Sequence, residues 1–282
     1  MMLKKIERGT MFIQTQSDLF RCPTCHQMMH AQEKALVCLE GHRFDVSKKG
    51  TLYFLNHQIK TDYDREMFEH RRKLIVHGMY QPLLDLLQPF CQNQRILDVG
   101  CGEGSFLQQL NEQATLLPSV GFDISKEGIY LASDYGENVF WCVADLTNLP
   151  FQEDRFTTIL NIFSPSNYQE FQRVLVDGGQ LIKVVPRSGY LKELRAAFYP
   201  EDEKKQHYSN QAVVEKFQET FRESERQTLT YVFDIPESCQ LSLLEMSPLE
   251  WGVSMEIKEK LQKKPLKRIT IDLDILIGRI SD

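Results

Sequence analysis

The sequence has 282 residues, of which 42% are hydrophobic and 26% are charged, and its formal net charge is -6. This length allows one large α/β domain with a small additional unit, and the hydrophobic content excludes a disordered chain. No apolar stretch of about 18 residues occurs, and the first residues lack the apolar core of a signal peptide, so we expect a cytoplasmic protein with no membrane partner.

The charge is unevenly distributed along the chain. Residues 1–80 hold 13 Lys and Arg against 9 Asp and Glu, a surplus of +4, and the remainder carries -10. Attraction to phosphate is local, because it is screened beyond roughly 10 Å, so a basic N-terminal part on an acidic body favours RNA as a partner. A surplus of this size is also within ordinary scatter, and charge alone leaves both interpretations open.

Residues 1–55 are rich in Cys, His and short β-prone pieces, and we expect a small metal-binding unit with no helix of useful length. Cys22, Cys25, Cys38 and His42 follow the spacing C-x2-C-x12-C-x3-H. Such spacing presents thiolates in pairs to one tetrahedral ion, and four protein ligands leave no open position, so the pattern predicts one structural zinc. His26 and His30 are competing fourth ligands, but His26 directly follows Cys25 and should point away. The odd total of seven cysteines argues against a disulfide framework and for a reducing compartment.

Residues 56–92 are predicted to form a helical bridge between two domains. From Thr61 to Phe90, apolar residues recur at helical spacing, and Gly78 with Pro82 marks a break between two helices.

Residues 93–282 alternate between apolar runs and amphipathic segments, as expected of an α/β domain with a mainly parallel sheet. The predicted strands are residues 95–99, 119–122, 138–143, 156–163 and 180–185. The predicted helices are residues 105–110, 126–135 and 168–175. Two late β-prone segments, residues 228–233 and 268–277, predict an added hairpin or antiparallel edge.

A glycine-rich turn follows the first predicted strand of this domain. Asp98 ends the strand, and Gly100, Gly102 and Gly104 follow, before the chain enters a helix. Glycines let the backbone approach a nucleotide, and the helix N-terminus adds positive potential. An acid at the strand end would repel a pyrophosphate, but it suits a ligand with an ammonium and a sulfonium, such as S-adenosylmethionine.

Two further acids follow the next two strands. Asp123 lies nineteen residues beyond Gly104, where a carboxylate can accept hydrogen bonds from both ribose hydroxyls. Asp145 follows the third strand and could accept from the adenine amino group. The alternative for each acid is a helix N-cap or an ordinary loop acid, which the register of the three acids disfavours.

Several segments together resemble a known family, the large-subunit (23S) ribosomal RNA guanine-N1-methyltransferases of the RlmA type. The resemblance covers nearly the whole chain. Its marks are the Cys22, Cys25, Cys38 and His42 set with Arg43-Phe44-Asp45, the bridge from Glu66 to Pro82, the Asp98 to Gly104 turn, Asn161-Ile162-Phe163-Ser164-Pro165, Pro186 to Leu194, and Met246-Ser247-Pro248 with Trp251.

The resemblance implies a class I, Rossmann-like methyltransferase sheet with a small N-terminal zinc-binding module. It implies zinc at the four ligands and S-adenosylmethionine against Tyr80, Gly104, Ser105 and Tyr190 as well as the acids. It also implies a homodimer whose zinc modules line a cleft for a ribosomal RNA hairpin near the macrolide site. Whether antibiotic resistance results stays open at this stage. The expected reaction is methyl transfer to N1 of a guanine.

The residues that contact the RNA are less well defined. Guanine N1 carries a proton, so a group must accept it, and the sequence identifies no such catalytic residue. Phe163, Tyr168 and Trp251 are candidates to stack on an extruded base, although each could be an ordinary core aromatic. The candidates for phosphate contacts are Arg71, Arg72, Lys73, Lys48 and Lys49, for which a solvated charged face is the alternative.

Two other functions remain open at this stage. One is a small-molecule methyltransferase, for which the zinc module would be superfluous. The other is a zinc-anchored RNA-binding protein with an inactive methyltransferase domain, against which the intact Asp98, Gly100, Gly102 and Asp123 set argues.

Overall fold

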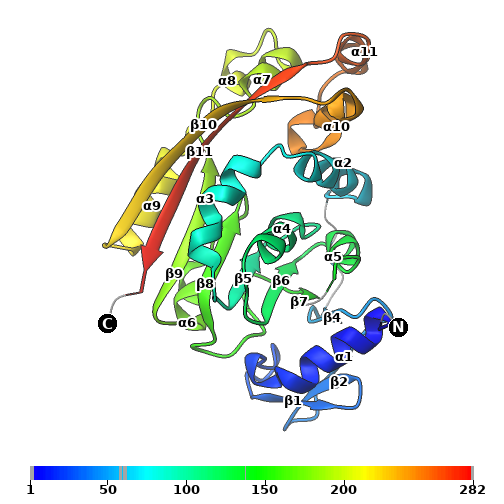
Figure 1. Ribbon diagram of the computed structural model, residues 1–282, viewed down its shortest axis with the longest axis vertical. Coiled ribbons are helices and arrows are strands. Elements are labelled where there is room, and N and C mark those ends of the chain that lie inside the picture. The colour runs from blue at the N-terminus through cyan, green and yellow to red at the C-terminus, as the bar shows by residue number, and fades with distance from the viewer. Residues whose placement is uncertain (1–2, 57–58, 60–61, 137, 281–282) are drawn as a thin grey trace.

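The computed structural model describes residues 3–56, 59, 62–136 and 138–280. Residues 57, 58, 60 and 61 of the predicted helical bridge lie outside these residues. Two sheets organise the fold: a three-stranded sheet near the N-terminus and an eight-stranded sheet that runs through the rest of the molecule (Figure 1).

The small antiparallel sheet contains β1 (Met29–Gln32), β2 (Ala35–Cys38) and β3 (Arg43–Asp45). It follows α1 (Lys5–Thr15) and a short 3-10 helix, η1 (Ser17–Leu19). The expectation of no useful helix in this segment was wrong. In α1 charged and polar residues surround the apolar positions and hide their helical spacing, and the helix is held by tertiary contacts such as the stacking of Phe12 on Phe140 at 4.8 Å.

The large sheet has the order β10-β11-β9-β8-β5-β6-β7-β4. Its strands are β4 (Leu52–Tyr53), β5 (Ile96–Val99), β6 (Ser119–Asp123), β7 (Val139–Val143), β8 (Phe156–Ile162), β9 (Leu175–Pro186), β10 (Ser224–Asp234) and β11 (Arg268–Arg279). The strands from β4 to β9 are parallel, and β11 and β10 form an antiparallel hairpin on the β9 edge. The predicted α/β class and the late hairpin are both confirmed, and β9 begins five residues before the predicted strand.

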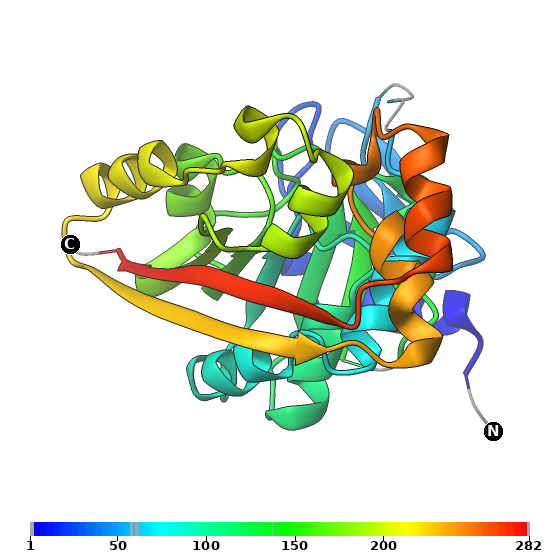
Figure 2. The same ribbon diagram turned by 90° about the horizontal axis from the view of Figure 1, so that it is seen from above.

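Helices cover both faces of this sheet. On one face lie α3 (Gln81–Cys91), α4 (Ser105–Gln113) and α5 (Lys126–Ala132), and on the other lie α6 (Tyr168–Val174) and α9 (Gln211–Thr220). Seen from above, α3 and α9 lie on opposite sides of the β10–β11 hairpin (Figure 2). The remaining helices are α2 (Arg65–Val76), α7 (Lys192–Phe198), α8 (Glu203–Gln206), α10 (Gln240–Glu245) and α11 (Met255–Lys263), with short 3-10 turns η2 (Glu237–Cys239) and η3 (Pro248–Glu250).

The strand order reverses between β5 and β8. From β5 the chain proceeds to β6 and β7 on one side, and it then returns to β8 and β9 on the other. A crevice forms beyond the carboxyl ends of parallel strands at such a reversal, because the flanking connections diverge to opposite faces. The fold therefore places the Asp98 turn, which follows β5, at the position where a ligand is expected.

The N-terminal segment is continuous with the large domain. β4 pairs in parallel with β7, and Ile13, Leu19 and Phe20 share a hydrophobic core with residues of the large sheet, among them Phe122 and Phe140. The zinc-binding unit is thus packed against the β7 edge of the sheet, where Figure 1 shows α1, β1 and β2.

Gly9 is the point of closest approach between α1 and the turn before β4. A Cβ atom at Gly9 would overlap with the backbone carbonyl of Gly50. Helix propensity alone predicts that Gly9→Ala stabilises the protein by about 1 kcal/mol. We expect instead a loss of about 1–3 kcal/mol in the free energy of unfolding, because the backbones must separate.

Urea denaturation of the two proteins measures this difference. Gln14→Ala, at an exposed position of the same helix, is the matched control and should change stability by less than about 0.5 kcal/mol. A Gly9→Ala protein more stable than the wild type would show that α1 does not pack as described.

Candidate cofactor and zinc sites

Cys22, Cys25, Cys38 and His42 come together in the N-terminal unit. Their ligand atoms all lie within 4.8 Å of one another. The Sγ atoms of Cys22 and Cys38 are 3.5 and 3.3 Å from Nδ1 of His42, and the Sγ atoms of Cys25 and Cys38 are 3.5 Å apart. Tetrahedral zinc with bonds of about 2.0–2.3 Å requires ligand separations of about 3.5–3.8 Å, so the cluster fits the ion.

Local backbone structure produces this cluster. The N–H of His26 donates to the carbonyl of Cys22, which closes the first turn, and the N–H of Gly41 donates to the carbonyl of Cys38, which closes the second. Gly41 has φ +81°, a conformation that glycine adopts without strain. His26 and His30 are exposed and lie outside the cluster.

The zinc assignment gives a direct prediction. His42→Ala should lose the metal, because three ligands remain and the structural site is no longer closed. His26→Ala, a change of the same kind four residues after the first ligand, should keep one zinc per chain. Metal analysis of the purified proteins measures both contents, and equal zinc in the two variants would contradict the assignment of His42.

A pocket of about 260 Å³ opens where the β5–β8 reversal predicts it. Gly100 and Gly102 of the turn, Asp123 after β6 and Asp145 after β7 border this pocket, which we call the cofactor pocket. The rest of its wall consists of Tyr63, Phe68, Arg71, Val99, Phe122, Ile124, Ala144, Leu146, Phe163, Ser164 and Pro165.

The turn after β5 depends on its glycines. Gly100 and Gly104 have φ +66° and +82°, values that side chains disfavour. A Cβ at Gly100 would lie 2.6 Å from Cβ of Ser164, and one at Gly104 would lie 2.7 Å from the Trp141 ring. These residues let the turn fit between the loop after β8 and the ring on β7.

Asp98 is the most unusual group at this site. Its side chain is 2% exposed, and Oδ2 has no hydrogen-bond partner in the described part of the chain. Burial, followed by repulsion from Asp123 and Glu103, raises the pKa of Asp98 to about 8. A cation bound nearby would favour the charged carboxylate, so the donor set fits a ligand with an ammonium and a sulfonium.

Asp123 is held rigidly at the pocket wall. Its Oδ2 accepts from the N–H of Gly102 at 2.8 Å, and its Oδ1 accepts from the N–H of Ser125 at 2.7 Å. Burial raises the pKa of Asp123, and the two backbone amides oppose this effect. A carboxylate oxygen accepts more than one hydrogen bond, so Asp123 retains capacity for ribose hydroxyls.

The other predicted cofactor residues lie outside the wall of the cofactor pocket. Tyr80 and Tyr190 are hydrogen-bonded to each other through their hydroxyls at 2.5 Å, and both rings pack on Phe163, which borders the pocket. Ser105 donates to Glu103 at 2.7 Å. Of the predicted cofactor residues, those that do not themselves border the pocket are Asp98, Gly104, Ser105, Tyr80 and Tyr190.

Arg72, a sequence candidate for phosphate contacts, faces the cofactor turn instead. Its Nε donates to the buried Glu103 carboxylate at 2.9 Å, and its guanidinium lies 4.5 Å from the Tyr135 ring centre. Arg71 borders the cofactor pocket, whereas Lys48, Lys49 and Lys73 are exposed. No sequence signal identified Glu103 as the partner of Arg72, because 31 residues separate them.

The three candidate stacking aromatics occupy different positions. Phe163 borders the cofactor pocket and has φ +56°, a rare value for a bulky residue and one that is found at functional sites. Trp251 is 43% exposed and contacts the edge of Tyr63, another pocket residue. Tyr168 packs against Phe217 and borders a second pocket.

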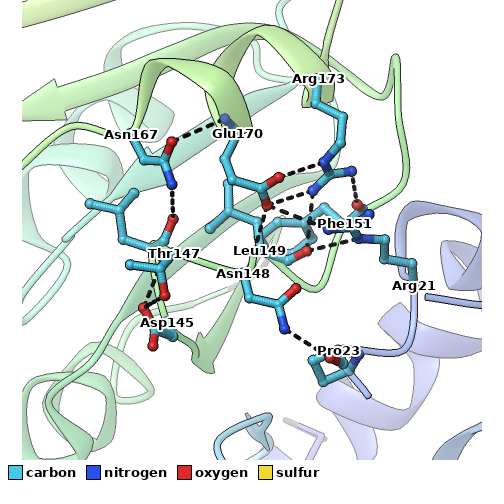
Figure 3. Close-up of polar contacts among 11 residues, drawn as sticks. Arg21, Pro23, Asp145, Thr147, Asn148, Leu149, Phe151, Asn167, Glu170 and Arg173 are labelled. Atoms are coloured by element: carbon cyan, nitrogen blue, oxygen red, sulfur yellow. Dashed lines mark hydrogen bonds and ion pairs between the residues drawn. The ribbon is translucent and has the colours of Figure 1, made fainter. Parts of the chain in front are cut away.

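A polar network ties the zinc unit to the wall of the cofactor pocket (Figure 3). Asn148 donates to the carbonyl of Pro23, the residue after the first zinc ligand, and Arg21 donates to the carbonyl of Leu149. Glu170 accepts from the N–H of Leu149 and pairs with Arg21 and Arg173. Burial alone would raise the pKa of Glu170, but these contacts lower it, so the network is charged at neutral pH.

The acidic pocket lies where the strand order reverses, and the segment after Asp145 is hydrogen-bonded to the unit that holds the three cysteines and His42. Together these sites define an S-adenosylmethionine-dependent methyltransferase with a structural zinc site. Family models agree: "Methyltransferase domain" matches residues 91–237, and "RlmA, N-terminal", a zinc ribbon, matches residues 20–61. The predicted fold class, cofactor and zinc are confirmed.

Relatives identify the family. The chain is 41% identical to the "Putative 23S rRNA (guanine-N(1)-)-methyltransferase YxjB" of Bacillus subtilis (strain 168) over 92% of this chain and 96% of that protein. It is 30% identical to the 23S rRNA (guanine(748)-N(1))-methyltransferase of Streptomyces fradiae over 62% of this chain and 65% of that protein. The chain belongs to this family, as the sequence resemblance indicated.

A solved structure supports the fold alone. The YcgJ protein of Bacillus subtilis matches with a TM-score of 0.50 and 18% identity, over 71% of this chain and 98% of that chain. Among the residues that the structure describes, no helix combines the length and apolar character needed to cross a membrane.

The pKa of Asp98 gives a prediction for cofactor binding. A positively charged ligand binds better to the ionised carboxylate, so affinity for S-adenosylmethionine should fall as the pH drops below about 8. Calorimetry from about pH 6 to about pH 9 measures this dependence, and a proton should be released on binding at neutral pH.

Asp98→Asn is the matched variant. It should bind the cofactor roughly 10- to 100-fold more weakly, because a charge-assisted contact is lost, and it should show a flatter pH dependence. Equal affinity and an equal pH dependence in the two proteins would contradict the role of Asp98.

Proposed function

We propose that this protein transfers a methyl group from S-adenosylmethionine to N1 of a guanine in a hairpin loop of large-subunit ribosomal RNA. The observation that carries the proposal is the identity of 41% with a protein of that name over almost the whole of both chains. The region that matches the relative therefore includes both the zinc ribbon and the cofactor pocket, and not only a methyltransferase domain.

We assign a separate role to each of three consecutive segments of the chain. Residues 1–55 recognise RNA, residues 56–92 form the helical bridge, and residues 93–282 bind the cofactor. The exposed Lys48, Lys49 and Lys73 are the proposed phosphate contacts. The protein acts in the cytoplasm, where its RNA is made, and we propose that it works as a homodimer whose zinc units line the RNA cleft.

When bound, S-adenosylmethionine supplies an electrophilic methyl group. Asp123 and Asp145, with Gly100 and Gly102 of the turn, border the cofactor pocket and would hold the cofactor there. The buried Asp98, which precedes Val99 and Gly100 of the pocket wall, would favour its positive charge. Fixing donor and acceptor in line in a site that excludes water provides most of the rate acceleration in such a displacement. Tyr80 and Tyr190 support this site through Phe163, which they contact.

If the protein methylated a small molecule, the substrate would not need the zinc unit. That unit is tied to the pocket wall through Asn148 and Glu170, an arrangement that suits a substrate large enough to contact both. The alternative of an inactive RNA-binding protein is opposed by the intact acidic pocket.

The reaction is tested on ribosomal RNA from a strain that lacks the gene. Purified protein and S-adenosylmethionine should introduce one 1-methylguanine per large-subunit RNA, detected as a new reverse-transcription stop and by nucleoside mass spectrometry. Asp98→Ala should lower the rate by roughly 100-fold or more.

Two results would contradict the proposal. One is an absence of 1-methylguanine in both free RNA and assembling subunits, and the other is methylation of a small metabolite at a higher rate. Sedimentation of the protein with and without RNA tests the homodimer separately.

A further inference from the structure

A second pocket, of about 530 Å³, adjoins the cofactor pocket. The two share Phe163, Ser164 and Pro165, the loop after β8. The second pocket is otherwise bordered by Ser166, by Tyr168 at the start of α6, by the end of β9, and by α9 with the residues before it. We call it the acceptor pocket, because it lies beside the loop that also borders the binding site of the methyl donor.

Lys183 borders the acceptor pocket from the middle of β9, where it is only 4% exposed. Its Nζ donates to Oδ1 of Asn161 at 2.6 Å and to Oγ of Ser166 at 2.8 Å. A third and longer contact, 3.2 Å, goes to the carbonyl of Ser164. All three acceptors are uncharged.

No described carboxylate forms an ion pair with Lys183, and burial alone lowers its pKa, to about 8. Burying an unpaired cation costs free energy, and such groups occur where an anion or a reaction requires them. The methyl donor in the neighbouring pocket is itself cationic, so an anion between the two positive charges would be stabilised by both.

We propose that the acceptor pocket binds the target base and that the Lys183 ammonium donates to O6 of guanine, which stabilises the base in its N1-deprotonated form. The inference rests on the proposed function. Loss of the N1 proton leaves a negative charge shared between N1 and O6, and a fixed cation beside O6 favours that form. The Ser164 carbonyl, the most distant of the three acceptors, is the one that O6 replaces.

The step balances without a further reactant. Water accepts the N1 proton, and the N1 electron pair then forms the bond to the methyl carbon. The bond from that carbon to sulfur breaks, and its electron pair stays on sulfur as a neutral thioether. One negative and one positive charge are thus both removed, and Lys183 remains an ammonium throughout.

The charged and titratable groups around Lys183 define its pH dependence. Tyr168 of α6, and Tyr208 and Lys216 from the α9 side, border the same pocket, and burial raises the pKa of both tyrosines. On β11, Asp274 is already paired with Arg226 and accepts from Asn210. Among these groups Lys183 is the one expected to lose its charge near pH 8. Deprotonation of N1 increases with pH, and loss of the Lys183 charge offsets this gain, so the rate should rise with pH up to about 8 and level off above that value.

Single-turnover methylation of a large-subunit RNA hairpin by the full chain, followed from about pH 6 to about pH 10, tests the role. Lys183→Met should lower the rate constant by roughly 100- to 1,000-fold, while calorimetry shows unchanged S-adenosylmethionine affinity. Lys183→Arg should retain more activity, and its rate should continue to rise above about pH 8, because a guanidinium stays protonated. Lys263→Met, at an exposed position of α11, is the control for removal of a lysine charge.

These outcomes distinguish failure of the proposed role of Lys183 from failure of the proposed function. A Lys183→Met enzyme within about threefold of the wild type, or a Lys183→Arg enzyme whose rate levels off near pH 8 as in the wild type, would overturn the role of Lys183 while N1 methylation by the wild type upholds the reaction. If Lys183→Met does not fold, the pH profile of Lys183→Arg decides. Wild-type methylation at an atom other than guanine N1 would overturn the reaction and this role together.

Discussion

The carboxylate of Asp98 is buried at the end of β5, and its Oδ2 has no hydrogen-bond partner in the described chain. Two other acids, Asp123 and Glu103, raise its pKa further. The charged form of Asp98 is therefore costly in the free protein, and a cationic ligand would offset that cost. The position of the turn, the three left-handed glycines and the rigid hold on Asp123 all serve to keep this uncompensated acid beside the cofactor pocket.

The zinc unit and the cofactor pocket form one body. β4 extends the large sheet, Phe12 of α1 stacks on Phe140 of β7, and the Glu170 network joins the residue after Cys22 to the chain that follows Asp145. An RNA held by the zinc unit would therefore keep a fixed position relative to the methyl donor. Such fixed geometry lowers the barrier of a displacement reaction more than a single contact does, because the donor and acceptor atoms must be aligned.

Local patterns predicted much of this structure. The strands of the large sheet were predictable because apolar runs end at charged or glycine-rich turns, and the zinc ligands were predictable because their spacing is short. Helix α1 was missed because Lys5, Glu7 and Arg8 interrupt its apolar face and its stability comes from distant partners. The pairing of Arg72 with Glu103 was not predictable for the same reason.

The site was predicted less completely than the fold. Asp98 and Asp123 lie at the carboxyl ends of β5 and β6, and Asp145 follows β7, so their convergence could be expected from the βαβ pattern. Tyr80 and Tyr190 entered only through resemblance, and the structure places them behind Phe163. Lys183 was overlooked, although a single lysine within Leu181-Ile182-Lys183-Val184-Val185 is visible in the sequence. Its significance depends on the neutral partners that only the fold brings to it.

Hydrogen–deuterium exchange with and without S-adenosylmethionine tests the central claim most directly, because it reports which backbone amides a bound ligand protects. The acidic pocket predicts protection at residues 100–105, at 123–125 and at 145–147, the segments at the carboxyl ends of β5, β6 and β7. Unchanged exchange at these three segments, with protection elsewhere in the chain, would contradict the account.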